Sequence, residues 1–90
     1  MKYSVQFTKR AMKQLHKMDK PMAAKIIDYM EEIEQLENPF SRGHGLVNNF
    51  KGMWRYRVAD WQVLCEVKES VLLIHVIHVE HRSCIYKENF

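Results

Sequence analysis

The 90-residue sequence predicts an α+β fold, with an N-terminal strand, an antiparallel helical hairpin and then a three-stranded antiparallel meander. Two observations predict it. Apolar residues recur at helical spacing in the first half of the chain and at every second position from about residue 50. No repeat, linker or low-complexity tract interrupts this order, so residues 1–90 are expected to form one domain with its helices on one face of a twisted sheet.

The first strand and helix are predicted by a change of pattern at Thr8. Residues 3–7 alternate apolar and polar side chains, as a half-buried strand does. Thr8 is a suitable N-cap for a helix that continues to about residue 18. The apolar stripe of this helix consists of Ala11, Leu15 and Met18.

A second helix follows almost at once. Asp19 is a good N-cap and Pro21 fits the first helical turn. Apolar residues at helical spacing then continue to about Leu36, and the two-residue gap between the helices favours a hairpin. Residues 37–49 are predicted to be a loop, because Asn-Pro and glycines interrupt the pattern.

The C-terminal half is predicted to be a meander of strands. A two-residue turn at Ala59-Asp60 places Arg57 opposite Gln62 and Arg55 opposite Leu64 on one face. The other face, toward the helices, then carries Trp54, Tyr56, Val63 and Cys65. The last strand, residues 71–79, is almost continuously apolar, as an internal strand should be.

Composition and cysteine usage point to the cytoplasm. No long apolar run follows the N-terminus, so no signal peptide is predicted, and residues 71–79 are too short to span a bilayer. Cys65 and Cys84 lack metal-binding spacing and are expected to be reduced thiols, although a disulfide between them stays open. A net charge of +3 is a mild indication of an anionic partner.

The predicted open face of the sheet carries two guanidinium groups. Arg55 and Arg57 are one strand repeat apart, roughly 7 Å, comparable with the spacing of phosphates along a nucleic-acid strand. Arginine binds phosphate through two hydrogen bonds at once. Solvent-facing strand positions are also commonly charged, so an ordinary solvated face fits the same pattern.

The C-terminal run adds further polar groups close to this face. His81, Arg82 and Tyr86 supply an imidazole, a third guanidinium and a phenol, which suit phosphodiester cleavage without a metal. A packed tyrosine in a solvated tail is the alternative. The spacing of three between His75, His78 and His81 predicts that His78 lies on the opposite face from the other two, which argues against a metal site.

Two segments of the sequence resemble the RelE family, the toxins of bacterial type II toxin–antitoxin systems within the RelE/ParE superfamily. They are Lys51-Gly52-Met53-Trp54-Arg55-Tyr56-Arg57 and the ending His81-Arg82-Ser83-Cys84-Ile85-Tyr86. The resemblance implies a ribosome-dependent mRNA endonuclease (an mRNA interferase) that arrests growth. In this reaction the ribose 2′-hydroxyl attacks the adjacent phosphate of A-site mRNA and leaves a 2′,3′-cyclic phosphate, with no metal or cofactor. It also implies a cognate antitoxin, and operator DNA as a partner of the toxin–antitoxin complex only.

The resemblance also implies roles for individual residues. Arg55 and Arg57 match the strand residues that hold the reacting phosphate. Arg82 matches an arginine that stabilises the leaving oxygen or supplies its proton, and Tyr86 matches a tyrosine that orients or stacks on the target base. Gln62 departs from the family, which commonly has an arginine there, and Lys51 is a candidate to replace that missing charge.

The general base stays open at this point. A guanidinium does not lose its proton in a protein, so neither strand arginine can accept one. His81, Tyr86, the ribosome and solvent are the candidates, and His81 is the one whose side chain ordinarily titrates near neutrality. Two other functions also stay open: a ParE-type toxin that poisons DNA gyrase, and an inactive homologue that binds only its antitoxin and operator.

Overall fold

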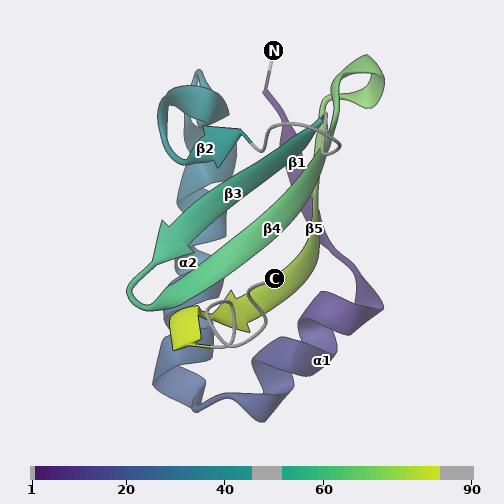
Figure 1. Cartoon of the computed structure of the whole chain (residues 1–90). Helices are drawn as coiled ribbons and strands as arrows, with labels where there is room; N and C mark the ends of the chain where they lie inside the picture. Colours follow the sequence, from purple (N-terminus) through teal and green to yellow (C-terminus); the bar gives the residue numbers. More distant parts are fainter. Residues whose placement is uncertain (1, 46–51, 84–90) are drawn as a thin grey trace.

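The computed structural model describes residues 2–45 and 52–83, which form one five-stranded sheet with two helices (Figure 1). The strand order is β1-β5-β4-β3-β2. In chain order the elements are β1 (Ser4–Phe7), α1 (Lys9–Lys17), α2 (Lys20–Gln35), η1 (Pro39–Ser41), β2 (His44–Gly45), β3 (Met53–Val58), β4 (Trp61–Lys68), η2 (Glu69–Val71) and β5 (Leu73–His81). This order confirms the predicted α+β class. In the part of the chain described, no helix is both long and apolar enough to cross a membrane.

Both helices begin at the predicted caps. The Thr8 hydroxyl accepts a hydrogen bond from the Ala11 backbone N–H at 3.1 Å, and the Asp19 carboxylate accepts one from Met22 N–H at 3.2 Å. The helices bury their apolar stripes against the sheet, and Figure 1 shows α2 running behind the strands. The side chains that form this core are Ala11, Leu15, Ile26, Met30 and Ile33 from the helices, and Tyr56, Val58, Val63, Cys65, Ile74, Val76 and Val79 from the strands.

The first strand is held by the last one. β1 pairs with β5 in parallel, from Ser4 opposite Leu73 to Phe7 opposite Val76. Thr8 then donates both its backbone N–H and its hydroxyl to the Val76 carbonyl, at 2.9 and 3.0 Å. The N-terminal strand therefore joins the sheet through a contact that spans almost the whole chain.

The β3–β4 hairpin has the predicted register. Val58 lies opposite Trp61, so Ala59 and Asp60 form a two-residue turn, and Ala59 adopts a left-handed conformation with φ 55°. The pairs Arg57–Gln62 and Arg55–Leu64 are confirmed. A turn of this kind does not require glycine if another residue adopts a positive φ.

Two regions of the chain differ from the prediction. The segment 37–49 is not wholly a loop, because η1 and the short strand β2 fall within it. The last strand is β5 at Leu73–His81 rather than residues 71–79, and its start is later because residues 69–71 form η2 and Leu72 turns the chain with φ 51°. Apolar composition alone does not show where such a turn ends and the strand begins.

A β-bulge in β5 also changes which face its polar residues occupy. Leu64 lies opposite His78, but the next residue, Cys65, lies opposite Val76, which leaves Ile77 as the additional residue. His75 and His78 therefore lie on the same face, opposite Glu66 and Leu64. The prediction that His78 lies on the opposite face from His75 was wrong, because it assumed an unbroken two-residue repeat.

Candidate functional site

The structure brings three of the predicted site residues together at the edge of β3. Arg55, Arg57 and Gln62 line a hollow of about 300 Å³, together with Tyr29, Gly43 and His44. Arg57 is exposed, whereas Arg55 and Gln62 are half-buried. None of the residues that line this hollow is acidic, so it is suited to an anion.

The hollow exists because β2 covers only part of β3. β2 begins at His44 opposite Arg55 and continues to Gly45 opposite Trp54, so among the described residues no strand pairs with the Arg57 end of β3 on this side. Gly43 allows the preceding segment to approach β3 closely, with φ 81°. A Cβ atom on Gly43 would lie 2.5 Å from the Arg55 carbonyl oxygen, so no larger residue fits without movement. The Trp54 Nε1 group fixes the same segment by donating to the Arg42 carbonyl at 2.8 Å.

The cations around the hollow differ in what they contact. Arg57 donates from Nε to the Ala59 carbonyl at 3.1 Å, and this holds the guanidinium beside the hairpin turn. Arg42 instead forms an ion pair with Glu32 at 2.7 Å, and that hydrogen bond raises the pKa of Arg42. The charge of Arg42 is therefore matched by Glu32, and we place the anion-binding capacity with Arg55 and Arg57.

Gln62 is the least satisfied polar group of the region. Its Oε1 atom is buried and has no hydrogen-bond partner among the residues that the structure describes. A buried acceptor without a partner destabilises a fold by about 1–3 kcal/mol, and such exceptions call for an explanation. Gln62 lies opposite Arg57 of β3 on one side and opposite Glu80 of β5 on the other. These three side chains form a row across the sheet, with the Gln62 amide in the middle.

On the far side of Gln62 from Arg57 lies a polar cluster that the sequence pattern did not predict. Glu80 lies opposite Gln62, and its Oε1 is 3.2 Å from His78 Nε2. His78 Nδ1 is in turn 2.9 Å from the Gln14 side-chain nitrogen of α1. The sequence signal was the two-residue spacing of His78 and Glu80, but the bulge hid their relation to the arginine face.

His81 lies outside this row. It pairs with Trp61, which precedes Gln62 and therefore points to the opposite face of β4. The two rings are in edge contact with centroids 5.1 Å apart, and His81 Nδ1 is 2.8 Å from the Ser83 hydroxyl. The C-terminal run was expected beside the arginine face or one strand away, but the His81 side chain lies on the opposite face, and we do not place it in the hollow.

The remaining predicted site residues lie at or beyond the ends of the described segments. Arg82 follows β5, is exposed, and donates its backbone N–H to the Asp60 carbonyl at 2.7 Å, close to the hairpin turn. Lys51 and Tyr86 lie outside the described residues. Within residues 2–45 and 52–83, no group of three His, Cys, Asp or Glu side chains is arranged to hold a metal ion.

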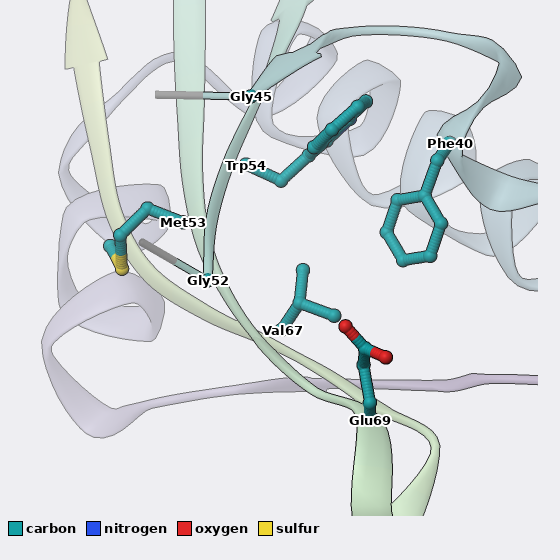
Figure 2. Close-up of a pocket in the computed structure, with 7 residues that line it drawn as sticks. All are labelled: Phe40, Gly45, Gly52, Met53, Trp54, Val67 and Glu69. Carbon is teal, nitrogen blue, oxygen red and sulfur yellow. The ribbon is translucent and has the colours of Figure 1, made fainter. Parts of the chain in front are cut away.

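A second hollow, of about 370 Å³, has a different character (Figure 2). Figure 2 shows the rings of Phe40 and Trp54 on one side and the side chains of Val67 and Glu69 on the other. Its lining is largely apolar, and its one charged residue is acidic. A phosphate group would be repelled there, so the arginine hollow remains the candidate site.

The family model for the ParE toxin of type II toxin–antitoxin systems matches residues 5–86. The chain belongs to this family. Toxin RelE of Mycobacterium tuberculosis is 26% identical over 87 residues, which is 97% of this chain and 89% of that protein. The predicted membership of the RelE/ParE toxins is therefore confirmed.

Solved structures of toxins from such systems share the fold of this ParE-family toxin. The RelBE2 toxin–antitoxin complex of M. tuberculosis matches with a TM-score of 0.79 and 22% identity, over 91% of this chain and all of that one. The RelB–RelE complex of Methanococcus jannaschii matches with a TM-score of 0.71 and 21% identity, over 94% and 99% of the two chains. The intact Escherichia coli RelBE complex matches with a TM-score of 0.69 and 14% identity, over 88% and 95%.

Proposed function

We propose that this toxin is a ribosome-dependent mRNA endonuclease that arrests growth by cutting A-site mRNA in the cytoplasm. The observation that carries the proposal is the hollow at the β3 edge, where Arg55, Arg57 and Gln62 meet with no acidic residue in the lining. Two guanidinium groups on one strand match the phosphates of a single RNA strand. The relatives named RelE support a nuclease rather than another kind of toxin.

In the proposed reaction the arginines stabilise negative charge on the phosphate, and the RNA itself supplies the nucleophile. Arg55 and Arg57 hold the non-bridging oxygens of the scissile phosphate, whose negative charge increases in the transition state. The 2′-oxygen forms a bond to phosphorus, the bond from phosphorus to the 5′-oxygen breaks, and a 2′,3′-cyclic phosphate remains. Arg82 stabilises the leaving oxygen, and the Gln62 amide donates to the phosphate. Tyr86 orients the target base, and Lys51 contributes a further charge.

The same family membership supports a protein partner. The structures of the M. tuberculosis, M. jannaschii and E. coli relatives are toxin–antitoxin complexes. We extend this to the present chain: a cognate antitoxin neutralises it, and the complex, but not the free toxin, binds operator DNA.

The test is cleavage of mRNA on ribosomes programmed with a defined A-site codon. Wild-type toxin should cut the mRNA and leave a 2′,3′-cyclic end, and a 2′-deoxy nucleotide at the cleavage position should abolish the cut. Arg57→Ala should slow cleavage by about 10²–10³-fold. Lys25→Ala, which removes a positive charge from the exposed surface of α2, is the matched control and should retain the rate.

A second candidate function is poisoning of DNA gyrase, because the matching family model carries the ParE name. Supercoiling assays with purified gyrase separate the two. Inhibition of gyrase with intact ribosome-bound mRNA would overturn the nuclease proposal in favour of a ParE-type toxin. Failure in both assays, with antitoxin binding retained, would leave an inactive binding module.

A further inference from the structure

The arginine face also carries a carboxylate in the same row. Arg57 of β3 lies opposite Gln62 of β4, and Gln62 lies opposite Glu80 of β5. Directly opposed residues point to the same face of a sheet, so the three side chains stand side by side. With neighbouring strands about 4.8 Å apart, Glu80 and Arg57 flank Gln62 at roughly 10 Å from each other. A phosphate with its attached ribose is long enough to lie over Gln62 and reach both side chains.

The carboxylate is held in place by an ordered chain of hydrogen bonds. The Val79 N–H donates to Gln14 Oε1 at 2.7 Å, which identifies the other amide atom, Nε2, as the donor facing His78 Nδ1 at 2.9 Å. His78 Nδ1 is then an acceptor, and a neutral ring carries its proton on Nε2, 3.2 Å from Glu80 Oε1. The chain of donors therefore ends on Glu80.

These hydrogen bonds determine whether His78 or Glu80 is free to accept a proton from a substrate. The lone pair of His78 is already used by Gln14. An ionised carboxylate has about four acceptor positions, and His78 uses one of them. The Glu80 and His78 side chains are 24% and 20% exposed, so the carboxylate is both oriented and open to a ligand.

We propose that Glu80 is the general base of the cleavage reaction, an inference that depends on the nuclease function proposed above. Glu80 takes the proton of the ribose 2′-hydroxyl, and the 2′-oxygen uses the released electron pair to bond to phosphorus. The bond from phosphorus to the 5′-oxygen breaks with its electron pair on that oxygen, which takes a proton from water. His78 and Gln14 are positioning residues that orient the carboxylate.

If Glu80 is only a solvated surface carboxylate, its removal should change the cleavage rate in the opposite direction. A carboxylate that only solvates this face repels the RNA backbone, so its removal should tighten binding and speed cleavage. A general base contributes about 10²–10⁴-fold, so its removal should slow cleavage even if binding improves. The direction of the rate change therefore discriminates between the two.

The experiment is single-turnover cleavage on programmed ribosomes at saturating toxin. Glu80→Gln keeps the shape and an acceptor for His78 Nε2–H, and should reduce the rate by about 10²–10³-fold. The rate should rise more steeply with pH for the variant than for the wild type, by up to about tenfold per pH unit, because hydroxide replaces the base. Glu66→Gln is the matched control, because Glu66 lies on the same face of β4, opposite His75, and its charge should not matter.

Glu80→Asp keeps a carboxylate on a side chain that is shorter by one methylene group, and should be slower than wild type but depend on pH less steeply than Glu80→Gln does. This second variant tests the inference independently of the stability of Glu80→Gln. Cleavage by Glu80→Gln at or above the wild-type rate overturns the role of Glu80 and leaves the nuclease function intact. Absence of ribosome-dependent cleavage by the wild type overturns both.

Discussion

Tyr56 donates its hydroxyl to the backbone carbonyl of Pro39 at 2.8 Å, which ties η1 to the centre of β3 beneath the arginine hollow. The Tyr56 side chain is fully buried, and burial raises its pKa, so the hydroxyl stays protonated as a donor at ordinary pH. We expect Tyr56→Phe to lower the free energy of unfolding by about 1–3 kcal/mol, because the Pro39 carbonyl loses its partner.

The measurement for Tyr56 is denaturant unfolding beside Tyr3→Phe. Tyr3 contacts the Phe40 ring at its edge, and in the described part of the chain its hydroxyl has no hydrogen-bond partner, so this substitution should change stability by less than about 0.5 kcal/mol. Equal effects of the two substitutions would show that the Pro39 contact contributes nothing.

A comparison of Gly43→Ala with Gly52→Ala tests how closely the segment at Gly43 approaches β3. Both have positive φ, 81° and 80°, so Gly→Ala imposes a similar conformational cost of about 1 kcal/mol at either position. Only at Gly43 would the new Cβ meet backbone at 2.5 Å, whereas at Gly52 the nearest such atom is at 3.7 Å. We expect Gly43→Ala to lower the melting temperature by several degrees more than Gly52→Ala does. Gly43→Ala should also reduce the rate of mRNA cleavage, because the hollow changes shape.

The buried thiol of Cys65 should make stability fall at alkaline pH. Burial raises the pKa of Cys65 to about 12, whereas an unfolded thiol ionises at about 8.5–9. The folded state therefore binds more protons than the unfolded state above pH 9, and the free energy of unfolding should decrease by up to about 1.4 kcal/mol per pH unit up to pH 12. Tyr56 shifts in the same direction, from about pH 10.

Urea unfolding between about pH 8 and 11 isolates the part due to Cys65, if wild type is compared with Cys65→Val. The variant lacks the thiol but retains Tyr56, so its stability should decline less steeply above pH 9. Parallel pH profiles for the two proteins would contradict the assignment to Cys65.

Gln62→Met is expected to separate stability from activity. It removes the buried Oε1 that has no partner in the described structure and keeps the length of the side chain, so the melting temperature should stay the same or rise. If the amide contacts the phosphate, the single-turnover rate should fall by about tenfold. A variant that is more stable and equally fast would remove Gln62 from the site.

Local signals in the sequence were sufficient for much of this structure. Thr8 and Asp19 cap the helices because their side chains satisfy backbone donors within three residues, and the two-residue turn after Val58 determines the whole β3–β4 register. The grouping of Arg55, Arg57 and Gln62 follows from that register alone. This part of the site could therefore be predicted without tertiary information.

The rest depended on interactions between distant segments. The bulge at Ile77 has no signature within an apolar run, yet it decides which face His75, His78 and His81 occupy. The parallel pairing of β1 with β5 and the short β2 are likewise products of tertiary packing. The β-bulge at Ile77 is the reason why the faces of the histidines were predicted wrongly and why Glu80 was not predicted to lie beside the arginines.

The pairing of the first strand with the last also has a consequence for biosynthesis. Thr8 and Val76, which are 68 residues apart, share two hydrogen bonds, and β5 also supplies His78 and Glu80 to the arginine face. During translation β1 emerges early and β5 late, so neither the finished sheet nor the complete row of Arg57, Gln62 and Glu80 can exist on a partly made chain. The arginine face therefore acquires its complete row of polar side chains only after translation has passed the last strand.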